Sequence, residues 1–419
     1  MDFINFESLT EYRYLLVLAA ILITTKLLGL ISRRVQMPQV VGALVAGVLL
    51  GPVVNAIFGL STAEGFFSST AGSDQIFGML SELGVIVLMF GAGLETDVNE
   101  MKKCGKASFV IALIGVLVPL FMGAGVSWFF IDNGESQVKL LKAIFIGVVL
   151  TATSVSITVE TLKELGKLNT HAGSAILGAA IIDDILGIVA LTIITSFGDK
   201  SVNIVLVLIK IVLFFIFALL LGFGMYMLYK WMNKSTKRNS RRHVIIAFSY
   251  CLISAFAAEV FFGVADITGA YIAGLVLSMT NRKRYLENRF ATLSYMFLSP
   301  IFFASIGLTI QLPSLTSSLL TFAVILTLVA IASKLFGCAF GAKICGYNAK
   351  DSFRIGAGMI SRGEVALIIA QKGKACGLMD ERLLGPLVIV VVITTIAAPI
   401  MLKMLYSNKN NKKLKTAKV

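Results

Sequence analysis

The sequence predicts an all-α integral membrane protein with about 13 transmembrane helices, arranged as two inverted five-helix repeats with crossed broken helices. Three observations carry this prediction: an apolar composition, a series of long apolar segments, and a short pattern that occurs twice. The 419 residues are 57% hydrophobic and 14% charged, and the mean hydropathy is +0.89. A water-soluble protein could not solvate so apolar a surface, whereas a chain that crosses a bilayer repeatedly requires one.

Thirteen apolar segments follow one another along the chain, and most approach the roughly 20 residues that a membrane-spanning helix needs. Only Gly263 to Asp266 separate the eighth from the ninth. An odd number of spans places the two termini on opposite sides. The segments comprise residues 12–31, 38–57, 75–94, 105–131, 139–162, 171–197, 202–232, 243–262, 265–280, 289–309, 314–345, 352–372 and 381–404.

Basic residues gather in every second loop and in the tail from Asn408. The positive-inside rule assigns these loops to the cytoplasm, so we expect the N-terminus outside and the C-terminus in the cytoplasm. This distribution accounts for the net charge of +14 without a nucleic-acid partner. No basic region marks a cleavable signal peptide in residues 1–11. The basic loops contain Arg33 and Arg34; Lys102, Lys103 and Lys106; Lys163 and Lys167; Lys230 to Arg242; Arg282, Lys283, Arg284 and Arg289; and Lys343, Lys350 and Arg354.

A pattern of small residues occurs twice in the same order. Residues 42–50 (GALVAGVLL) resemble residues 269–277 (GAYIAGLVL), and residues 90–94 (FGAGL) resemble residues 304–308 (ASIGL). Seven segments separate the matching members, so the copies, segments 2–6 and 9–13, cross the membrane in opposite directions. Inverted repeats of this kind are typical of secondary transporters, whose binding site lies at mid-membrane where the repeats meet.

Two adjacent carboxylates, Asp183 and Asp184, interrupt the apolar run of residues 171–197. At about 1.5 Å per residue they lie roughly 18–20 Å from its start, near the centre of the membrane. Charges at that depth are unfavourable, and adjacent like charges more so unless a proton or a cation neutralises them. The pair therefore indicates an ion or proton pathway; the alternative is a buried structural ion pair.

The repeat predicts broken helices in segments 5 and 12, its fourth members. Segment 5 contains Thr153 and Ser154 within four hydroxyl residues at 151–156, which can bind freed backbone groups or coordinate a cation. Segment 12 is rich in glycine and contains Arg362 and Glu364, which can neutralise the ends of crossed half-helices. Alternatively, the hydroxyl groups bond only to their own helix.

Segment 11 contains Lys334, nine residues or about 14 Å from Lys343 at the cytoplasmic end. An unpaired ammonium group at that depth is unfavourable, so Lys334 needs an acidic partner. Asp183 and Asp184 are the candidates, and the sequence does not choose between them.

Glu82 and Glu259 also lie within apolar runs. Each is either a polar contact or part of a cavity lining, and both interpretations stay open. The five cysteines follow no metal-binding spacing, so we expect small core residues and no cofactor.

These motifs resemble those of bacterial monovalent cation/proton antiporters. The doubled aspartate at 183–184, the Thr-Ala-Thr-Ser break at 151–154, Lys334 and the Ser-Arg-Gly-Glu-Val run at 361–365 are similar to the cation:proton antiporter-2 family. That family includes sodium/proton antiporters and glutathione-gated potassium efflux systems, and the resemblance covers nearly the whole chain. The efflux systems carry a large cytoplasmic nucleotide-binding domain, for which this tail is too short.

The resemblance implies a homodimer embedded in membrane lipids, in which a mobile core domain carries the ion by an elevator-like movement against a dimer domain. The implied dimer domain comprises residues 1–104 and 233–313, the core domain residues 105–200 and 314–404, the linker helix residues 201–232, and the basic cytoplasmic tail residues 405–419.

The resemblance also implies residue roles. Asp184 would be the main cation and proton carrier, and Asp183 would pair with Lys334. Ionised Asp184, helped by oxygens of Thr153 and Ser154, can take Na⁺, whereas protonated Asp184 cannot, so one site gives obligatory exchange. If cation binding also separates Asp183 from Lys334, the unpaired lysine releases a second proton, and exchange is electrogenic.

The same residues are compatible with other classes of transport protein. The oxygens do not distinguish Na⁺ from K⁺ or Li⁺, so a K⁺/H⁺ antiporter for potassium efflux stays open, as do a channel and a sodium-coupled solute symporter. An intramembrane aspartyl protease is disfavoured, because adjacent residues on one helix point about 100° apart and cannot share a proton across a gap. We therefore expect a transporter and not an enzyme.

Overall fold

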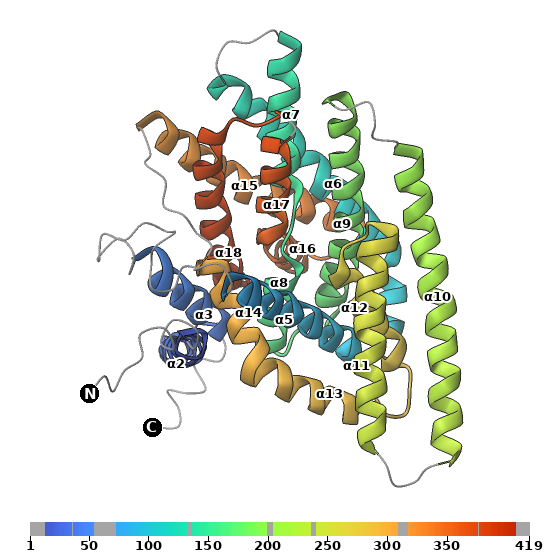
Figure 1. Ribbon diagram of the computed structural model, residues 1–419. Helices are drawn as coiled ribbons and strands as arrows, with labels where there is room; N and C mark the ends of the chain where they lie inside the picture. Colours follow the sequence, from blue (N-terminus) through green and yellow to red (C-terminus); the bar gives the residue numbers. More distant parts are fainter. Residues whose placement is uncertain are drawn as a thin grey trace, which may run out of the picture. The chain divides into compact units, whose positions relative to one another are not determined.

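The computed structural model describes residues 13–35, 37–53, 73–131, 136–198, 204–235, 240–308, 317–375 and 377–407. Every regular element in these ranges is a helix (Figure 1), as the composition predicts. The chain divides into two compact units, each built from two stretches that are distant in the sequence. The first is Met1–Val98 with Val205–Ser314, and the second is Asn99–Ile204 with Leu315–Val419. The start at residues 1–11 and the tail at 408–419 lie outside the described residues.

The first unit contains eight α-helices within its described residues, three of them extended by a π-helical turn. The turns, at Leu49–Val53, Ala258–Phe262 and Ser294–Leu298, follow α3, α11 and α13. The helices are α2 (Arg13–Arg34), α3 (Gln39–Val48), α5 (Ser73–Glu95), α10 (Ile204–Ser235), α11 (Ser240–Ala257), α12 (Asp266–Ser278), α13 (Lys283–Leu293) and α14 (Ser299–Leu308).

The pattern that occurs twice forms two equivalent helix contacts in this unit. A Cβ atom at Gly47 of α3 would lie 2.1 Å from the carbonyl oxygen of Ala304 in α14. A Cβ atom at Gly274 of α12, the matching position, would lie 2.1 Å from the carbonyl oxygen of Phe90 in α5. The first helix of each predicted repeat therefore packs, backbone to backbone, on the second helix of the other repeat, and only glycine allows this approach.

The correspondence extends one helix further than the sequence pattern. A Cβ atom at Gly42 would lie 2.4 Å from the carbonyl oxygen of Leu28 in α2, and one at the matching Gly269 would lie 2.3 Å from that of Ser254 in α11. Helices α2 and α11 thus occupy matching places beside α3 and α12. The sequences of α2 and α11 show no matching pattern, because these helices make the contacts through backbone carbonyl groups, which every residue has.

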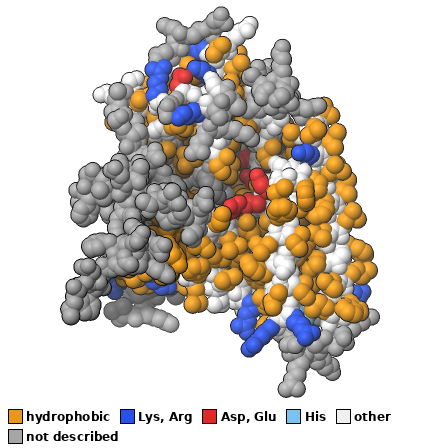
Figure 2. All heavy atoms as spheres, in the orientation of Figure 1, with side chains coloured by type: hydrophobic (Ala, Val, Ile, Leu, Met, Phe, Trp, Pro, Cys, Tyr) orange, Lys and Arg blue, Asp and Glu red, His pale blue; other side chains and the backbone are white. Residues whose placement is uncertain are grey.

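Helix α10 presents a long apolar surface. Leu219 and Leu220 are 73% and 70% exposed, whereas Gly222 approaches Val276 of α12, and the Tyr229 hydroxyl donates to the His243 carbonyl of α11 at 2.5 Å. Figure 2 shows hydrophobic side chains over α10 and α11, with Lys and Arg gathered near the end where the two helices are joined. This distribution is that of a helix packed on protein along one side and in contact with lipid along the other.

The second unit contains two helices that are interrupted in mid-course. A cluster of buried apolar side chains, including Phe145, Leu326 and Leu387, packs α7, α15 and α18 together. The helices are α6 (Val98–Phe130), α7 (Ser136–Thr151), α8 (Val155–Glu164), α9 (His171–Gly198), α15 (Ser317–Ile344), α16 (Ala349–Gly358), α17 (Glu364–Ala375) and α18 (Leu384–Tyr406), with a 3₁₀ turn at Glu381–Leu383.

Ten helical stretches among the described residues are long and apolar enough to cross a membrane. Two shorter apolar helices, Gln39–Gly51 and Asp266–Ser278, match predicted segments 2 and 9. The interrupted pair α16 and α17 matches segment 12. Each of the thirteen predicted segments therefore contains helix, and the smaller count of full-length spans reflects short and broken members.

Candidate functional site

Two helix breaks meet in the second unit, at the segments where the sequence predicts them. Helix α7 ends at Thr151 and α8 begins at Val155, while residues 359–363 separate α16 from α17. The backbone N–H of Ser154 donates to the carbonyl oxygen of Ser361 at 2.7 Å, and the Ser361 hydroxyl donates to the carbonyl of Ser154 at 2.8 Å. The two breaks therefore satisfy each other's freed backbone groups, which is what unwound chain inside a membrane protein requires.

A further hydroxyl and a glycine support this crossing. Thr158 of α8 donates to the carbonyl oxygen of Gly358, the last residue of α16, at 2.7 Å. A Cβ atom at Gly363 would lie 2.8 Å from the hydroxyl oxygen of Ser154, so the crossing needs glycine there. The hydroxyl groups of segment 5 therefore have different roles. Thr151 donates to the carbonyl oxygen of Val148 in its own helix at 2.7 Å, which is the alternative interpretation of these hydroxyl groups.

Arg362 neutralises the carbonyl groups that surround the crossing. Its guanidinium group is buried and donates from Nη2 to Leu150 at 2.6 Å, and from Nη1 to Ala330 at 3.2 Å and Ile360 at 3.1 Å. Leu150 lies in the last turn of α7, where a cation stabilises the negative end of the helix dipole. Glu364 begins α17, and its side chain lies outside the described residues.

Lys334 of α15 forms a buried ion pair with Asp183 of α9. The Nζ–Oδ1 distance is 2.7 Å, and the two residues are 0% and 2% exposed. The structure therefore selects Asp183 from the two candidates. Helix α6 packs closely beside the ion pair at Gly115. A Cβ atom at Gly115 would lie 2.6 Å from Cys338 Sγ and 3.9 Å from Lys334 Nζ.

Asp184 differs from its neighbour in both exposure and pairing. It is partly exposed within its unit, because successive residues of an α-helix point about 100° apart. Its carboxylate forms no hydrogen bond or ion pair with any residue that the structure describes. The doubled aspartate therefore comprises one neutralised carboxylate and one without a counter-ion.

Two buried oxygen atoms beside the ion pair have unused hydrogen-bonding capacity. Asp183 Oδ2 and Thr153 Oγ1 meet no hydrogen-bond partner within the described chain, although Thr153 lies close enough to act on the Asp183 carboxylate. Carboxylate and hydroxyl oxygens are the ligands that hard cations prefer. Ser154 is placed differently, since its backbone holds the crossing and its hydroxyl lies 3.3 Å from that of Ser156.

Two positioning residues were not found from the sequence. Thr158 lies just beyond the Thr-Ala-Thr-Ser run, and Thr395 of α18 donates its hydroxyl proton to the carbonyl oxygen of Arg362. The signal for Thr395 is a Thr-Thr pair within an otherwise apolar segment. A hydroxyl pair at mid-helix is also compatible with bonding to its own helix, which is what Thr394 does.

Glu82 and Glu259 belong to the first unit, whereas the residues that form the crossing belong to the second. Both are exposed within that unit, and both act electrostatically on Asp266 at the start of α12. They therefore belong to a separate acidic group. Among the described residues, no cluster of three or more His, Cys, Asp or Glu side chains could hold a metal ion.

Comparison with known proteins gives a consistent result. The family model "Sodium/hydrogen exchanger, transmembrane" matches residues 17–407. The chain is 39% identical over 410 residues to the Na⁺/H⁺-K⁺ antiporter GerN of Bacillus cereus, covering 97% of this chain and 100% of GerN. It is also 39% identical over 396 residues to a Na⁺/H⁺ antiporter of Enterococcus hirae, covering 92% of this chain and 96% of that protein.

The fold also resembles a solved structure. The sodium proton antiporter MjNhaP1 of Methanocaldococcus jannaschii matches with a TM-score of 0.68 and 17% sequence identity, covering 96% of each chain. At that identity the likeness concerns the fold alone. The relatives are named as antiporters, so they are transporters and not enzymes. The family match over nearly the whole chain, together with relatives at 39% identity, shows that this chain belongs to the transmembrane sodium/hydrogen exchanger family.

Proposed function

We propose that this chain is a secondary active antiporter that exchanges Na⁺ for H⁺ across a membrane. The observation that carries the proposal is the unequal pair on α9: Lys334 neutralises Asp183, whereas Asp184 has no counter-ion within the described residues. A carboxylate inside a membrane protein that no protein cation neutralises is suited to hold a proton or a cation. The names of the matched relatives, both Na⁺/H⁺ antiporters, support this activity.

Exchange follows from the charge of Asp184. When ionised it holds Na⁺, assisted by Thr153 Oγ1 and Asp183 Oδ2, the two buried oxygens without partners. When protonated it cannot hold Na⁺. One site that accepts either ion, but never both, moves the two ions in opposite directions. Ser154 positions Thr153 by holding the crossing, and its hydroxyl is a further candidate ligand.

A second proton comes from Lys334. Cation binding draws the Asp183 carboxylate toward the cation and away from the ammonium group, which then lies unpaired in apolar surroundings and releases its proton. Two protons then move against one monovalent cation, so exchange is electrogenic. The membrane potential contributes about 2.3 kcal/mol per charge per 100 mV to this exchange.

The unit that contains the crossing is the proposed mobile core, which carries the bound ion by an elevator-like movement. All the proposed site residues lie in this unit, so it can move as one body without dividing the site. The other unit is the proposed dimer domain of a homodimer, and α10 is the linker. The site residues are Thr153, Ser154, Asp183, Asp184, Lys334, Arg362 and Glu364.

The proposed location is the cell inner membrane, with the N-terminus outside and the basic tail in the cytoplasm. The distribution of Lys and Arg between alternate loops supports this orientation. The ions themselves are the only non-protein components that the mechanism needs, and membrane lipids surround the protein.

K⁺ is the second candidate cation, and Li⁺ the third. The name of GerN includes K⁺ as well as Na⁺, which favours a site that admits both. Carboxylate and hydroxyl oxygens serve either ion, so the spacing of these oxygens around the bound ion sets the preference.

The deciding experiment is a cation panel on purified protein in liposomes that report ΔpH with a dye. Na⁺ alone is expected to discharge an imposed ΔpH, and the same protocol with K⁺ and Li⁺ ranks the cations. Liposomes with the Asp184→Asn variant serve as the control for leak. If Na⁺, K⁺ and Li⁺ all leave ΔpH unchanged unless an organic solute is added, the protein is a symporter and the proposal is wrong.

A further inference from the structure

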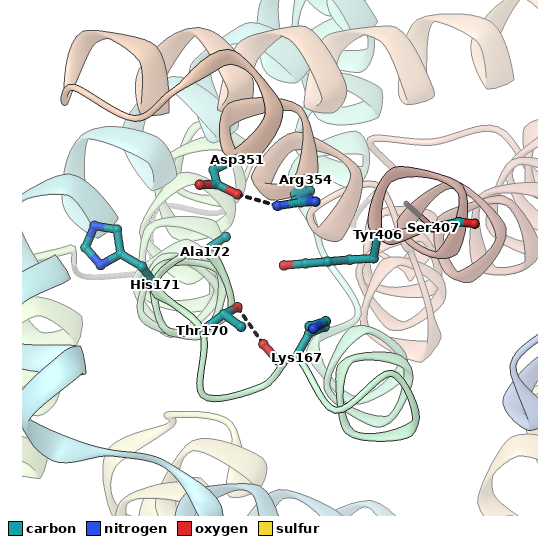
Figure 3. Close-up of a pocket in the computed structure, with 8 residues that line it drawn as sticks. All are labelled: Lys167, Thr170, His171, Ala172, Asp351, Arg354, Tyr406 and Ser407. Atoms are coloured by element: carbon teal, nitrogen blue, oxygen red, sulfur yellow. Dashed lines mark hydrogen bonds and ion pairs between the residues drawn. The ribbon is translucent and has the colours of Figure 1, made fainter. Parts of the chain in front are cut away.

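A polar cavity of about 530 Å³ opens in the second unit, remote along α9 from the aspartates. It lies between the start of α9, the start of α16 and the end of α18, at the end of the unit that the positive-inside rule assigns to the cytoplasm. Figure 3 shows its lining residues, with Tyr406 reaching between Arg354 and Thr170. His171 belongs to the lining, but its ring points away from the centre, toward Cys104, whose sulfur lies 3.3 Å from Nδ1.

Positive charge in this cavity exceeds negative charge. Lys167 and Arg354 are its cationic side chains, and Asp351 is its one carboxylate. Both oxygens of Asp351 are already engaged, one by Arg354 Nη1 at 2.7 Å and the other by Asn348 Nδ2 at 2.8 Å. Asp351 therefore does not neutralise Lys167.

Unused donors converge on the same space. The partly buried Lys167 side chain forms no ion pair or hydrogen bond in the described part of the chain. Arg354 uses Nη1 on Asp351 and Nε on the carbonyl of Leu405, which leaves Nη2 available. The Tyr406 hydroxyl is buried and forms no hydrogen bond of regular geometry with a described residue, although Thr170 lies close enough to act on it.

The N-terminus of α9 adds a positive electrostatic potential to the cavity. This helix has 28 residues, and Ala172 in its first turn lines the cavity. The hydroxyl of Thr170 accepts from the backbone N–H of Gly173 at 3.1 Å. The backbone N–H of Ala172, one residue earlier, has no carbonyl partner within the helix, as is usual in a first turn. The positive end of the helix dipole therefore faces the cavity, where it favours an anion.

We propose that this cavity binds a phosphate-bearing anion between Lys167 and Arg354. The donors come from different elements: the planar guanidinium of Arg354, the ammonium of Lys167, the phenol of Tyr406, and N–H groups at the start of α9. Donors that approach from several directions suit a tetrahedral oxyanion. The cavity has room for a phosphate together with an attached organic group. The bound anion links α9, which carries the aspartates, with α16, which leads into the crossing. The anion is either a soluble phosphate or the headgroup of an anionic lipid.

The first test measures binding to purified full-length protein, separately from transport. Inorganic phosphate is titrated in neutral detergent against chloride at equal ionic strength, with the melting temperature as readout. In a parallel arm, nanodiscs of phosphatidylglycerol are compared with nanodiscs of phosphatidylcholine. A saturable rise in melting temperature is expected in at least one arm, and the arm that responds identifies the source of the phosphate.

Variants locate the site. Lys167→Gln is expected to weaken binding by about tenfold or more, the loss typical of one charge-assisted contact. Lys350→Gln, an exposed lysine of α16 that does not line the cavity, is the matched control and is expected to bind as the wild type does. Tyr406→Phe keeps the ring that lies 4.4 Å from Arg354 Cζ and removes only the hydroxyl, so it is expected to weaken binding severalfold.

Absence of a saturable response in both arms overturns the proposal. An equal response of Lys167→Gln and Lys350→Gln also overturns it, because the effect would then be one of general charge. Neither outcome bears on cation exchange, since the measurement uses no ion gradient.

Discussion

Asp183 and Asp184 are chemically identical neighbours on α9 that the fold places in different surroundings. Asp183 is buried and lies 2.7 Å from the ammonium nitrogen of Lys334, whereas Asp184 is partly exposed and unpaired within the described chain. The difference follows from the helical rotation between adjacent residues, which turns one carboxylate toward α15 and the other away. A site for exchange needs this inequality, because only an unpaired carboxylate is free to take either ion.

The first prediction concerns Asp184→Asn. The amide is nearly isosteric and the carboxylate forms no hydrogen bond or ion pair with a described residue. The melting temperature is therefore expected to stay near that of the wild type, while Na⁺-dependent proton movement is abolished. The measurement is dye-reported ΔpH in everted vesicles. Asp97→Asn, which removes an exposed carboxylate between α5 and α6, is the control. Wild-type exchange by Asp184→Asn would exclude this residue as the carrier.

The second prediction concerns Lys334→Gln. Removing one member of a buried ion pair leaves the Asp183 charge uncompensated, so unfolding is expected to become easier by about 3–5 kcal/mol. The double variant Lys334→Gln with Asp183→Asn removes both charges and is expected to recover much of that loss. Melting temperatures in detergent compare the single and double variants.

The second prediction also concerns the charge balance, because we propose that Lys334 sets the charge that moves in each cycle. If Lys334 supplies the second proton, Lys334→Gln is expected to exchange through Asp184 alone and to become electroneutral. Current on a solid-supported membrane, measured beside vesicle ΔpH, tests this. A Lys334→Gln current per cation equal to that of the wild type would make the lysine a structural counter-ion only.

The third prediction separates two threonines of the broken helix. Thr153 Oγ1 has no described hydrogen-bond partner, whereas Thr158 donates to Gly358 at 2.7 Å. Thr153→Val is therefore expected to raise the apparent KM for Na⁺ more than it lowers the maximal rate. Thr158→Val is expected to lower the melting temperature by breaking a buried hydrogen bond. An unchanged KM for Thr153→Val in liposomes would remove Thr153 from the cation site.

At the scale of helices, the molecule is assembled through backbone contacts at glycine. Gly47 on Ala304 and Gly274 on Phe90 are the same contact made twice by matching positions. Lipid tails are as apolar as leucine side chains, so burial of leucine gives little drive for helices to associate in a membrane. Close approach at small residues supplies that drive through dispersion forces, and it fixes which helices become neighbours.

The fourth prediction compares two glycines of α5. A Cβ atom at Gly93 would lie 2.2 Å from the backbone carbonyl oxygen of Tyr271, which cannot move aside, whereas a Cβ atom at Gly78 meets no atom within 4 Å. Gly93→Ala is expected to lower the melting temperature sharply. Gly78→Ala is expected to leave it unchanged or to raise it slightly, because alanine favours the helix by up to about 1 kcal/mol. Similar melting temperatures for the two variants would contradict the close α5–α12 contact.

At the scale of the whole molecule, the chain forms two units, and each is completed by a stretch from the second half of the sequence. One unit contains the helix breaks, Arg362 and the aspartate–lysine pair; the other contains the glycine contacts and Glu82, Glu259 and Asp266. The placement of every proposed ligand in one unit is compatible with the elevator-like movement that we propose, because that movement does not divide the site.

The fifth prediction concerns orientation. An Arg242→Cys variant, in the first turn of α11, is expected to react with a membrane-impermeant maleimide in inside-out vesicles, because this end of α11 is assigned to the cytoplasm. A Lys200→Cys variant is expected to react in intact spheroplasts, because residue 200 lies between predicted segments 6 and 7, on the side assigned to the outside. The wild-type protein measures labelling of the native cysteines. The opposite pattern would invert the proposed topology.

The sequence alone determined the class of fold, the helical segments, the positions of the breaks and the doubled aspartate. These features follow from local properties: apolar length, glycine and hydroxyl content, and the unfavourable burial of charge in a bilayer. The glycine pattern also predicted the repeat, but not its extension to α2 and α11, since those helices contribute backbone carbonyls that any residue supplies.

The residues by themselves left open which aspartate pairs with Lys334; the family resemblance implied Asp183, and the tertiary structure contains that ion pair. Only the tertiary structure decided which hydroxyl groups hold the crossing and which remain available. Pairing depends on how α9 is rotated against α15, and a sequence with two adjacent acids is compatible with either rotation. The tertiary structure also brings Lys167, Arg354 and Tyr406 together around one cavity. These residues come from three distant stretches, and each stretch by itself is a basic loop or a helix end without a recognisable motif. Sites of this kind arise from the meeting of distant segments, for which local sequence carries no signal.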